Sequence, residues 1–346
     1  MRKVLVFMVI LGTVFLVSCS NKEATNEENE QIEVDDEEKE VEKQENIYPF
    51  TGIQTESAVN ERVVGIMVNN HPTARPQTGL SKADIVFEIL SEGDITRLLA
   101  LYQSEEPDVV GPVRSAREYY FELASDYGAL YIYHGAAEFI DDMIKNKGID
   151  HLNGAIYDND GHLFKRESFR KAPHNSYLQF TAVNEVAESN GYEMTSTYEA
   201  LPFMDEDDTV EGENIQNVEI TYSNRTYSKV AYEYDEEKET FIRYNGDEMT
   251  VELDTDNPIE LDNVFIVETV HEIIDNAGRR EIDLESGGNA YLLQKGKIQH
   301  VQWENQDGRI LPVKDGQTVN FVPGKTWINV VPTDPGIENL VTVTND

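Results

Sequence analysis

Two arginines bracket the start of a predicted helix in the first half of this chain. A Gly-Pro pair at 111–112 interrupts the preceding structure, and Ser115 followed by Glu118 predicts a helix N-terminus with a capping box. The first N–H groups of a helix are unpaired and attract anions. Arg114 and Arg117 add bidentate donors at the same place. The pattern predicts an anion-binding site.

The same arginines have a simpler interpretation. Nearby carboxylates such as Glu88, Glu92 or Asp94 offer partners, and ion pairs with them would only hold the loops in place. The sequence leaves both interpretations open and does not name a ligand.

Further arginines and histidines lie in loops or at element ends, where binding sites are usually built. If they converge, they can bind phosphate or carboxylate, with histidine as an added donor or acid. A structural or surface role is the alternative for each histidine. Together with His71, the candidate ligand-binding residues are Arg75, Arg97, Arg114, Arg117, His134, His174 and Asn175.

Other motifs do not carry chemistry. The run His271-Glu272-Ile273-Ile274-Asp275 starts like a zinc-protease helix, but its second ligand position is Asp and it follows a β-rich run. An acidic loop at 158–167 lacks the first ligand of a calcium loop. Ser115 is assigned to the helix cap and not to a nucleophile. We therefore predict no metal, no cofactor and no catalytic residue.

The elements that must position these residues alternate in the first half. Strand patterns at 62–69, 83–90, 96–103 and 129–133 accompany helix patterns at 115–127, 136–147 and 181–191. The 83–90 pattern predicts one wetter face, and its Gly93 turn predicts a hairpin with 96–103. From about residue 218 onward, strand patterns separated by turn residues dominate.

The N-terminus has the pattern of a bacterial lipoprotein. Arg2 and Lys3 precede an apolar run at 4–17 that is too short to span a membrane and fits a signal peptide. Ser18 stands before Cys19, which is the single cysteine of the chain. This arrangement predicts a signal peptide at 1–18 and a diacylglyceryl group on Cys19, with palmitate-type acyl chains as the membrane anchor.

A strongly acidic tether is predicted at 19–47, because this segment has too few apolar residues to fold. The remaining chain divides into a predicted domain at 48–193 and a second at 194–346. The net charge of −38 disfavours nucleic-acid binding. The predicted fold class is α+β, with a layered α/β N-terminal domain followed by a β-rich C-terminal domain.

Several runs resemble the YerB-like lipoproteins of Gram-positive bacteria. They are 69–80, 83–88, the Thr96-Arg97 pair, 111–117 and 172–175, with weaker similarity around Tyr234, 243–246 and 324–328. The resemblance covers most of residues 60–335. It implies an α+β first domain, a β-rich second domain and a lipid anchor, but no reaction, because no function is assigned to the family.

These patterns favour a lipid-anchored envelope protein on the extracytoplasmic face of the cell membrane. Its expected role is a binding or accessory module, with an anionic envelope ligand or an envelope protein as partner, and the patterns favour this role over that of an enzyme. An envelope transferase that handles phosphate or pyrophosphate is one alternative. A solute-binding lipoprotein is another, although the hairpin-rich second half lacks the repeated βαβ units usual in that class.

Overall fold

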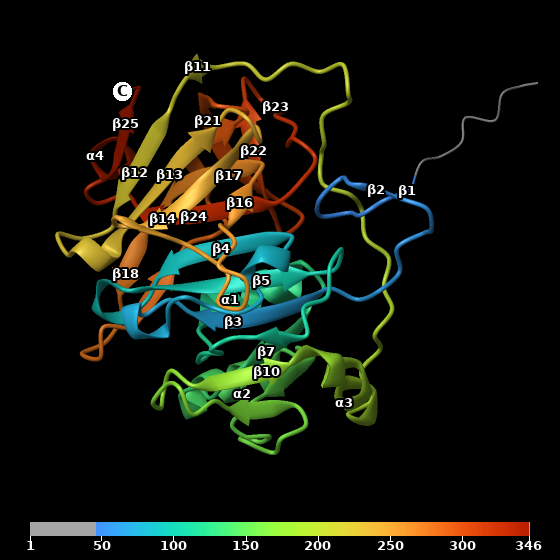
Figure 1. Cartoon of the computed structure of the whole chain (residues 1–346). Coiled ribbons are helices and arrows are strands. Elements are labelled where there is room, and N and C mark those ends of the chain that lie inside the picture. The colour runs from blue at the N-terminus through green and yellow to red at the C-terminus, as the bar shows by residue number, and fades with distance from the viewer. Residues whose placement is uncertain (1–45, 346) are drawn as a thin grey trace, which may run out of the picture. The chain divides into compact units, whose positions relative to one another are not determined.

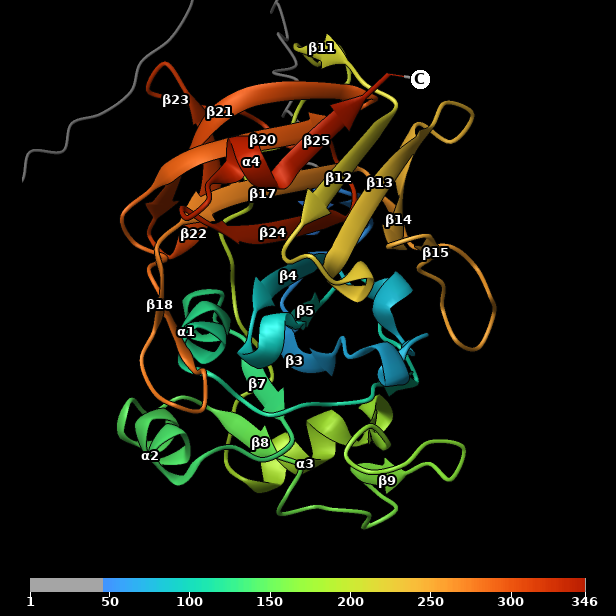
Figure 2. The same cartoon turned by 90° about the vertical axis from the view of Figure 1, so that its left-hand side faces the viewer.

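A long mixed sheet runs through both halves of the chain. The structure, a computed structural model, describes residues 46–345, so the predicted signal peptide, Cys19 and nearly all of the acidic tether lie outside the described residues. Within that range no helix is long and apolar enough to cross a membrane. In Figure 2 the strands of the long sheet follow one another from β21 down to β8.

The long sheet has twelve strands within residues 46–345, and its central order is β17-β24-β4-β5-β3-β7-β8. Strands β3, β4, β7, β8, β17 and β24 run in one direction, and β5 runs against them. The strands are β3 (Val64–Asn69), β4 (Ile85–Leu90), β5 (Thr96–Tyr102), β7 (Leu130–Tyr133), β8 (His151–Asn153), β11 (Glu213–Asn214), β17 (Asn263–Thr269), β20 (Gly288–Gln294), β21 (Lys297–Gln306), β22 (Arg309–Lys314), β23 (Gln317–Thr318) and β24 (Thr326–Pro332).

Smaller sheets, four α-helices and five short 3-10 helices complete the described residues (Figure 1). One sheet holds β12 (Asn217–Thr221), β13 (Lys229–Asp235), β14 (Thr240–Asn245), β15 (Glu248–Met249), β16 (Glu260–Leu261) and β25 (Val341–Thr344), and another holds β6 (Val109–Val110), β9 (Phe164–Arg166) and β10 (Ser176–Gln179). Two hairpins pair β1 (Asn46–Ile47) with β2 (Gln54–Thr55) and β18 (His271–Ile273) with β19 (Arg280–Ile282). The helices are α1 (Glu118–Asp126), α2 (Glu138–Asn146), α3 (Val183–Ser189) and α4 (Ile337–Leu340).

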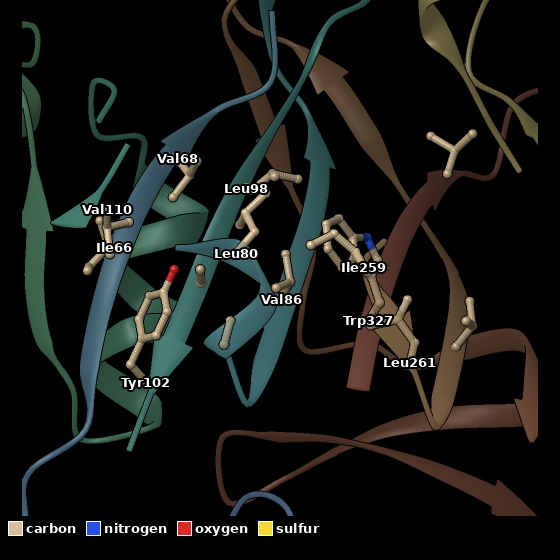
Figure 3. Packing of buried hydrophobic residues seen from close by; sticks show 14 of the residues in the cluster. Ile66, Val68, Leu80, Val86, Leu98, Tyr102, Val110, Ile259, Leu261 and Trp327 are labelled. Carbon is tan, nitrogen blue, oxygen red and sulfur yellow. The ribbon is translucent and has the colours of Figure 1, made fainter. Parts of the chain in front are cut away.

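The long sheet buries both of its faces. On β4, Ile85, Phe87 and Ile89 pack into a cluster that includes residues of α1 and α2. Val86 and Leu90, on the opposite face, pack into a second cluster with residues of β10, α3 and β12. Figure 3 shows part of this second cluster, in which Val86 of β4 and Trp327 of β24 lie on neighbouring strands. The α+β architecture and the β-rich second half agree with the sequence-based prediction.

Two local predictions are wrong. The β4 strand has no wetter face, because all six of its residues are buried between the two clusters. Ser115 is not the helix cap, since α1 starts at Glu118 with Arg117 in the N-cap position and without a side-chain cap. Residues 115–117 stay outside the helix, with Arg117 extended, because neighbouring groups bind their backbone: Arg97 donates to the Ser115 carbonyl, and Ala116 donates to the Gly135 carbonyl.

Candidate functional site

The predicted site residues gather mainly at one edge of the long sheet, where β3 and β7 reach their carboxyl ends. Asn69 ends β3 and is followed by His71, while His134 directly follows β7. Arg97 lies opposite Asn69 at the start of β5, because β5 runs in the reverse direction. Ligands of sheets with parallel strands commonly bind at this carboxyl edge.

The segment that carries Arg114 is fixed against β3. The backbone N–H of Arg114 donates to the Met67 carbonyl at 2.8 Å, and the backbone N–H of Val113 donates to the carbonyl of Ser176 in β10 at 2.7 Å. Gly111 permits this close packing, since a Cβ atom there would lie 2.8 Å from the Tyr177 ring. The position of Arg114 is thus set by strands on both sides.

The Arg114 guanidinium has no bound acceptor. It is half-buried, and within residues 46–345 its side chain forms no hydrogen bond or ion pair. Burial lowers its pKa, and the charge of Arg117 lowers it further. A half-buried cation without an acceptor is costly unless a ligand supplies one.

Two histidines are stacked near this arginine, with the ring centroids of His71 and His174 4.6 Å apart. Their tautomers follow from their neighbours. The Thr73 backbone N–H donates to Nδ1 of His71 at 3.2 Å. Asn69 accepts the His71 backbone N–H on Oδ1, so its Nδ2 donates to Nδ1 of His174 at 2.9 Å. Each neutral ring therefore carries its proton on Nε2.

Both imidazoles stay neutral at neutral pH. Burial lowers the pKa of His71, and the charges of Arg114 and Arg75 lower it further. Burial also lowers the pKa of His174, followed by the effects of His71, Arg114 and Arg170. In this tautomer the rings offer Nε2–H donors to an anion, and they do not offer a lone pair to a metal ion.

Arg97 and Arg117 follow the simpler interpretation. Both bind Glu92, with Arg97 Nη2 at 3.1 Å from Oε2 and Arg117 Nη2 at 2.6 Å from Oε1. Burial lowers the pKa of Arg97 to about 10, so it remains charged. One carboxylate thus serves two guanidinium groups, and the local charge stays positive.

Arg75 is bound only to neutral acceptors. Its Nε donates to Oδ1 of Asn70 at 3.0 Å, and its Nη2 donates to the Tyr227 carbonyl at 3.4 Å. Burial, followed by the charge of Arg243, lowers its pKa to about 10. The guanidinium therefore keeps a full positive charge within electrostatic range of His71.

His134 and Asn175 belong to a separate network. Nε2 of His134 lies 3.3 Å from Asp158, which also pairs with Arg166. Arg166 in turn donates to Oδ1 of Asn175 at 2.8 Å. Their side chains are thus engaged with one another, although the His134 backbone N–H donates to the Arg114 carbonyl at 2.9 Å and Asn175 directly follows His174. Both residues lie beside the His71–His174 pair along the backbone, but their side chains already have partners.

Two contributors were absent from the sequence-based prediction. Asn69 orients both histidines through its side chain. Arg170 bonds to the carbonyls of Ala74 and Pro76 and to the Tyr177 hydroxyl, which ties the loop before His174 to the loop after His71. Arg170 belongs to a basic run at 165–171, and such a run in so acidic a chain is a usable signal.

A cleft of about 860 Å³ lies elsewhere, between α1 and the β18–β19 hairpin. Six carboxylates and one lysine line it, so it repels anions. Its charged lining consists of Glu122, Asp126, Glu272, Glu281, Asp283, Glu285 and Lys147.

Comparisons with known proteins place this chain in a family without an assigned function. Residues 50–193 match the model described as "Protein of unknown function (DUF3048) N-terminal domain", and residues 218–328 match the corresponding C-terminal domain. The chain belongs to the DUF3048 family.

A curated relative and a solved structure agree with this assignment. The chain is 42% identical over 319 residues to "Putative lipoprotein YerB" of Bacillus subtilis (strain 168), which covers 92% of this chain and 91% of that protein. The crystal structure of the YerB protein from Bacillus subtilis matches with a TM-score of 0.79 and 42% identity, over 86% of this chain and 99% of that one. The resemblance stated from the sequence motifs is confirmed.

Proposed function

We propose that this protein is a lipid-anchored envelope protein whose first family domain binds an anionic group. The name of the Bacillus relative and the Ser18-Cys19 pattern support an anchor at Cys19 on the extracytoplasmic face. The site is the basic cluster, defined here as Arg114, His71 and His174 together with Arg75, Arg97, Arg117 and Arg170.

One observation carries the proposal: Arg114 is half-buried and lacks an acceptor among residues 46–345, and it lies within electrostatic range of two imidazoles whose Nε2 atoms are donors. Glu92 acts on Arg114 only from a distance, and in a chain of net charge −38 a cation without a bound acceptor in the described part is unexpected. A bound anion would satisfy Arg114 and both Nε2–H groups at once.

A chain that begins at residue 45 suits the test. Residues 45–346 form one contact unit apart from the preceding segment, and the solved relative of similar extent crystallised. We would measure thermal unfolding with sulfate, phosphate and pyrophosphate. A ligand at 100 times its Kd stabilises by about 2.7 kcal/mol, which is readily detected.

The expected result is stabilisation by at least one anion, lost in Arg114→Ala and kept in Arg279→Ala. Arg279 is a suitable control because it is an arginine outside the basic cluster that pairs with Asp275 at 2.5 Å. Absence of any shift in the well-folded chain, or an equal shift in the Arg114→Ala variant, would contradict the proposal.

A further inference from the structure

We infer that the basic cluster takes a terminal phosphoryl group as its dianion, the form present in a deprotonated phosphate monoester and at one end of pyrophosphate. This inference rests on the proposed function and specifies the ligand class. Two features of the cluster carry it: the excess of positive charge and the absence of acceptors.

The charge excess favours a multivalent anion. The cluster contains five guanidinium groups, and among the described residues Glu92 is the one carboxylate that forms an ion pair with any of them. Arg75 and Arg170 bind neutral oxygens, and the Arg114 side chain binds no oxygen of residues 46–345. A monoanion such as a carboxylate or a phosphodiester leaves most of this charge uncompensated, whereas a dianion neutralises more of it.

The imidazoles add only donors. Nδ1 of His71 and Nδ1 of His174 are occupied by N–H donors from Thr73 and Asn69, so the outward nitrogen of each ring carries hydrogen. The Arg114 guanidinium has no acceptor capacity either. A phosphate that retains a proton would bring an O–H group to Arg114 and two Nε2–H groups, none of which can accept it. The site therefore selects against protonated phosphate.

The carboxylates around the cluster do not change this conclusion. Glu88 and Glu248 act on Arg75 electrostatically without binding it, and both oxygens of Glu88 are engaged elsewhere, by Arg243, Trp327 and Asn70. Both oxygens of Glu92 are engaged, Oε1 by Arg117 and Oε2 by Arg97 and the Ser91 hydroxyl. Burial raises the pKa of Glu92. The charge of Arg97, the hydrogen bond from the Ser91 hydroxyl and the charge of Arg117 outweigh this effect and bring the pKa below its ordinary value, so the carboxylate remains ionised. Its role is to orient two guanidinium groups.

The test compares four probes on the chain that begins at residue 45, by isothermal titration calorimetry at pH 7.5 and 5.5. They are dimethyl phosphate, methyl phosphate, pyrophosphate and sulfate. Sulfate keeps two charges and no proton across this range, so it reports any change in the protein itself. Dimethyl phosphate keeps one charge throughout.

At pH 7.5 we expect methyl phosphate and pyrophosphate to bind at least about tenfold more tightly than dimethyl phosphate. A tenfold ratio corresponds to about 1.4 kcal/mol. Relative to sulfate, methyl phosphate should bind about fourfold more weakly at pH 5.5, because the second pKa of a phosphate monoester is about 6.

The outcomes separate the two claims. The ligand-class inference is wrong if dimethyl phosphate binds as tightly as methyl phosphate. It is also wrong if the affinity for methyl phosphate, relative to that for sulfate, is higher at pH 5.5 than at pH 7.5. In both cases the anion site stands. If no probe binds a folded chain, both claims are wrong. In a His71→Gln/His174→Gln variant, whose amides offer donors and acceptors, the pH-dependent gap between methyl phosphate and sulfate should shrink.

A second pair of arms identifies the source of the phosphoryl group. Glycerol phosphate tests a soluble ligand, and phosphatidylcholine vesicles with phosphatidic acid test a lipid headgroup, with pure phosphatidylcholine as background. Binding of glycerol phosphate or of the phosphatidic acid vesicles that is lost in Arg114→Ala supports the inference. The probe that binds more tightly identifies the source of the phosphoryl group. Failure of both arms would overturn the inference.

Discussion

At the scale of single residues, the basic cluster separates cations with structural partners from a cation without one. Arg97 and Arg117 are held by Glu92, while Arg114 has no bound acceptor in the part of the chain that the structure describes. Removing the unpaired cation should therefore leave the free energy of unfolding nearly unchanged, whereas breaking the ion pairs should lower it. This contrast distinguishes a binding site from a network that merely stabilises loops.

The Arg114→Ala variant should be as stable as the natural chain in anion-free buffer, within about 0.5 kcal/mol. The substitution removes a guanidinium that gains no hydrogen bond and suffers repulsion from Arg117. Thermal unfolding in buffer without phosphate or sulfate measures the effect. A loss above about 1 kcal/mol would show that Arg114 is a structural residue.

The free energy of unfolding of the Glu92→Gln variant should be lower by about 2 kcal/mol, which is the usual contribution of a hydrogen bond to a charged group. Glu92 binds both Arg97 and Arg117, and the substitution leaves two mostly buried cations without their counter-ion. Urea unfolding gives the difference. Unchanged stability would mean that solvent or neighbouring carbonyls replace the carboxylate.

The His71–His174 pair should make the chain less stable as the pH falls. Burial and the surrounding arginines hold both pKa values below the ordinary 6.5, so below that pH the unfolded chain takes up protons that the folded chain does not. The free energy of unfolding is unaffected by the pair above about pH 7 and decreases from there toward pH 5.

A His71→Gln/His174→Gln variant should show a smaller decrease over the same pH range, measured by urea unfolding at several pH values. The natural chain serves as reference, because His134 and other groups titrate equally in both. An unchanged pH profile would show that these two imidazoles do not carry the effect.

At the scale of elements, a buried ion pair joins the two halves. Glu88 of β4 and Arg243 of β14 are fully buried, with Arg243 Nη2 at 2.8 Å from Glu88 Oε2. Trp327 of β24 donates to the same carboxylate oxygen at 2.9 Å, and Asn70, next to His71, donates to the other. The loop that carries Arg75 is thus connected to strands of the second half.

The Glu88→Gln variant should lose about 3–5 kcal/mol, because it leaves Arg243 buried without its counter-ion. A Glu88→Gln/Arg243→Met variant should recover part of this loss, since it removes the orphaned charge. Chemical unfolding of the three chains tests the prediction. A Glu88→Gln variant as stable as the natural chain would contradict the prediction.

At the scale of the whole described unit, the long sheet contains strands from both family domains and continues across the boundary between them. β4 pairs with β24 over five residues from Ile85–Thr326 to Ile89–Val330, and β24 also pairs with β17. The same continuity is visible in Figure 2. Separating the halves would expose two long, buried edges.

We therefore expect that residues 46–193 and 194–346, produced separately, do not fold, while the two produced together assemble. Amide NMR dispersion of each half, alone and combined, measures this. A well-dispersed spectrum of residues 46–193 alone would show that the first domain folds independently, despite the shared sheet.

The amino-acid sequence by itself determined the elements and the inventory of charged groups. Apolar periodicity located β3, β4, β5, β7 and α1, because local spacing fixes which residues a strand or helix buries. The site residues Arg75, Arg114 and His174 were found from their positions in loops with Pro and Gly. The family resemblance followed from the same loops.

Tertiary structure alone decided which charged groups have partners. Glu92 and the backbone around Ser115 engage Arg97 and Arg117, Asp158 and Arg166 engage His134 and Asn175, and Arg114 is left without an acceptor. Ion pairs and tautomers depend on atoms distant in sequence meeting within a few ångströms, and side-chain spacing along the chain does not encode that. The β3–β5 register, which places Arg97 opposite Asn69, is the physical step that assembles the site.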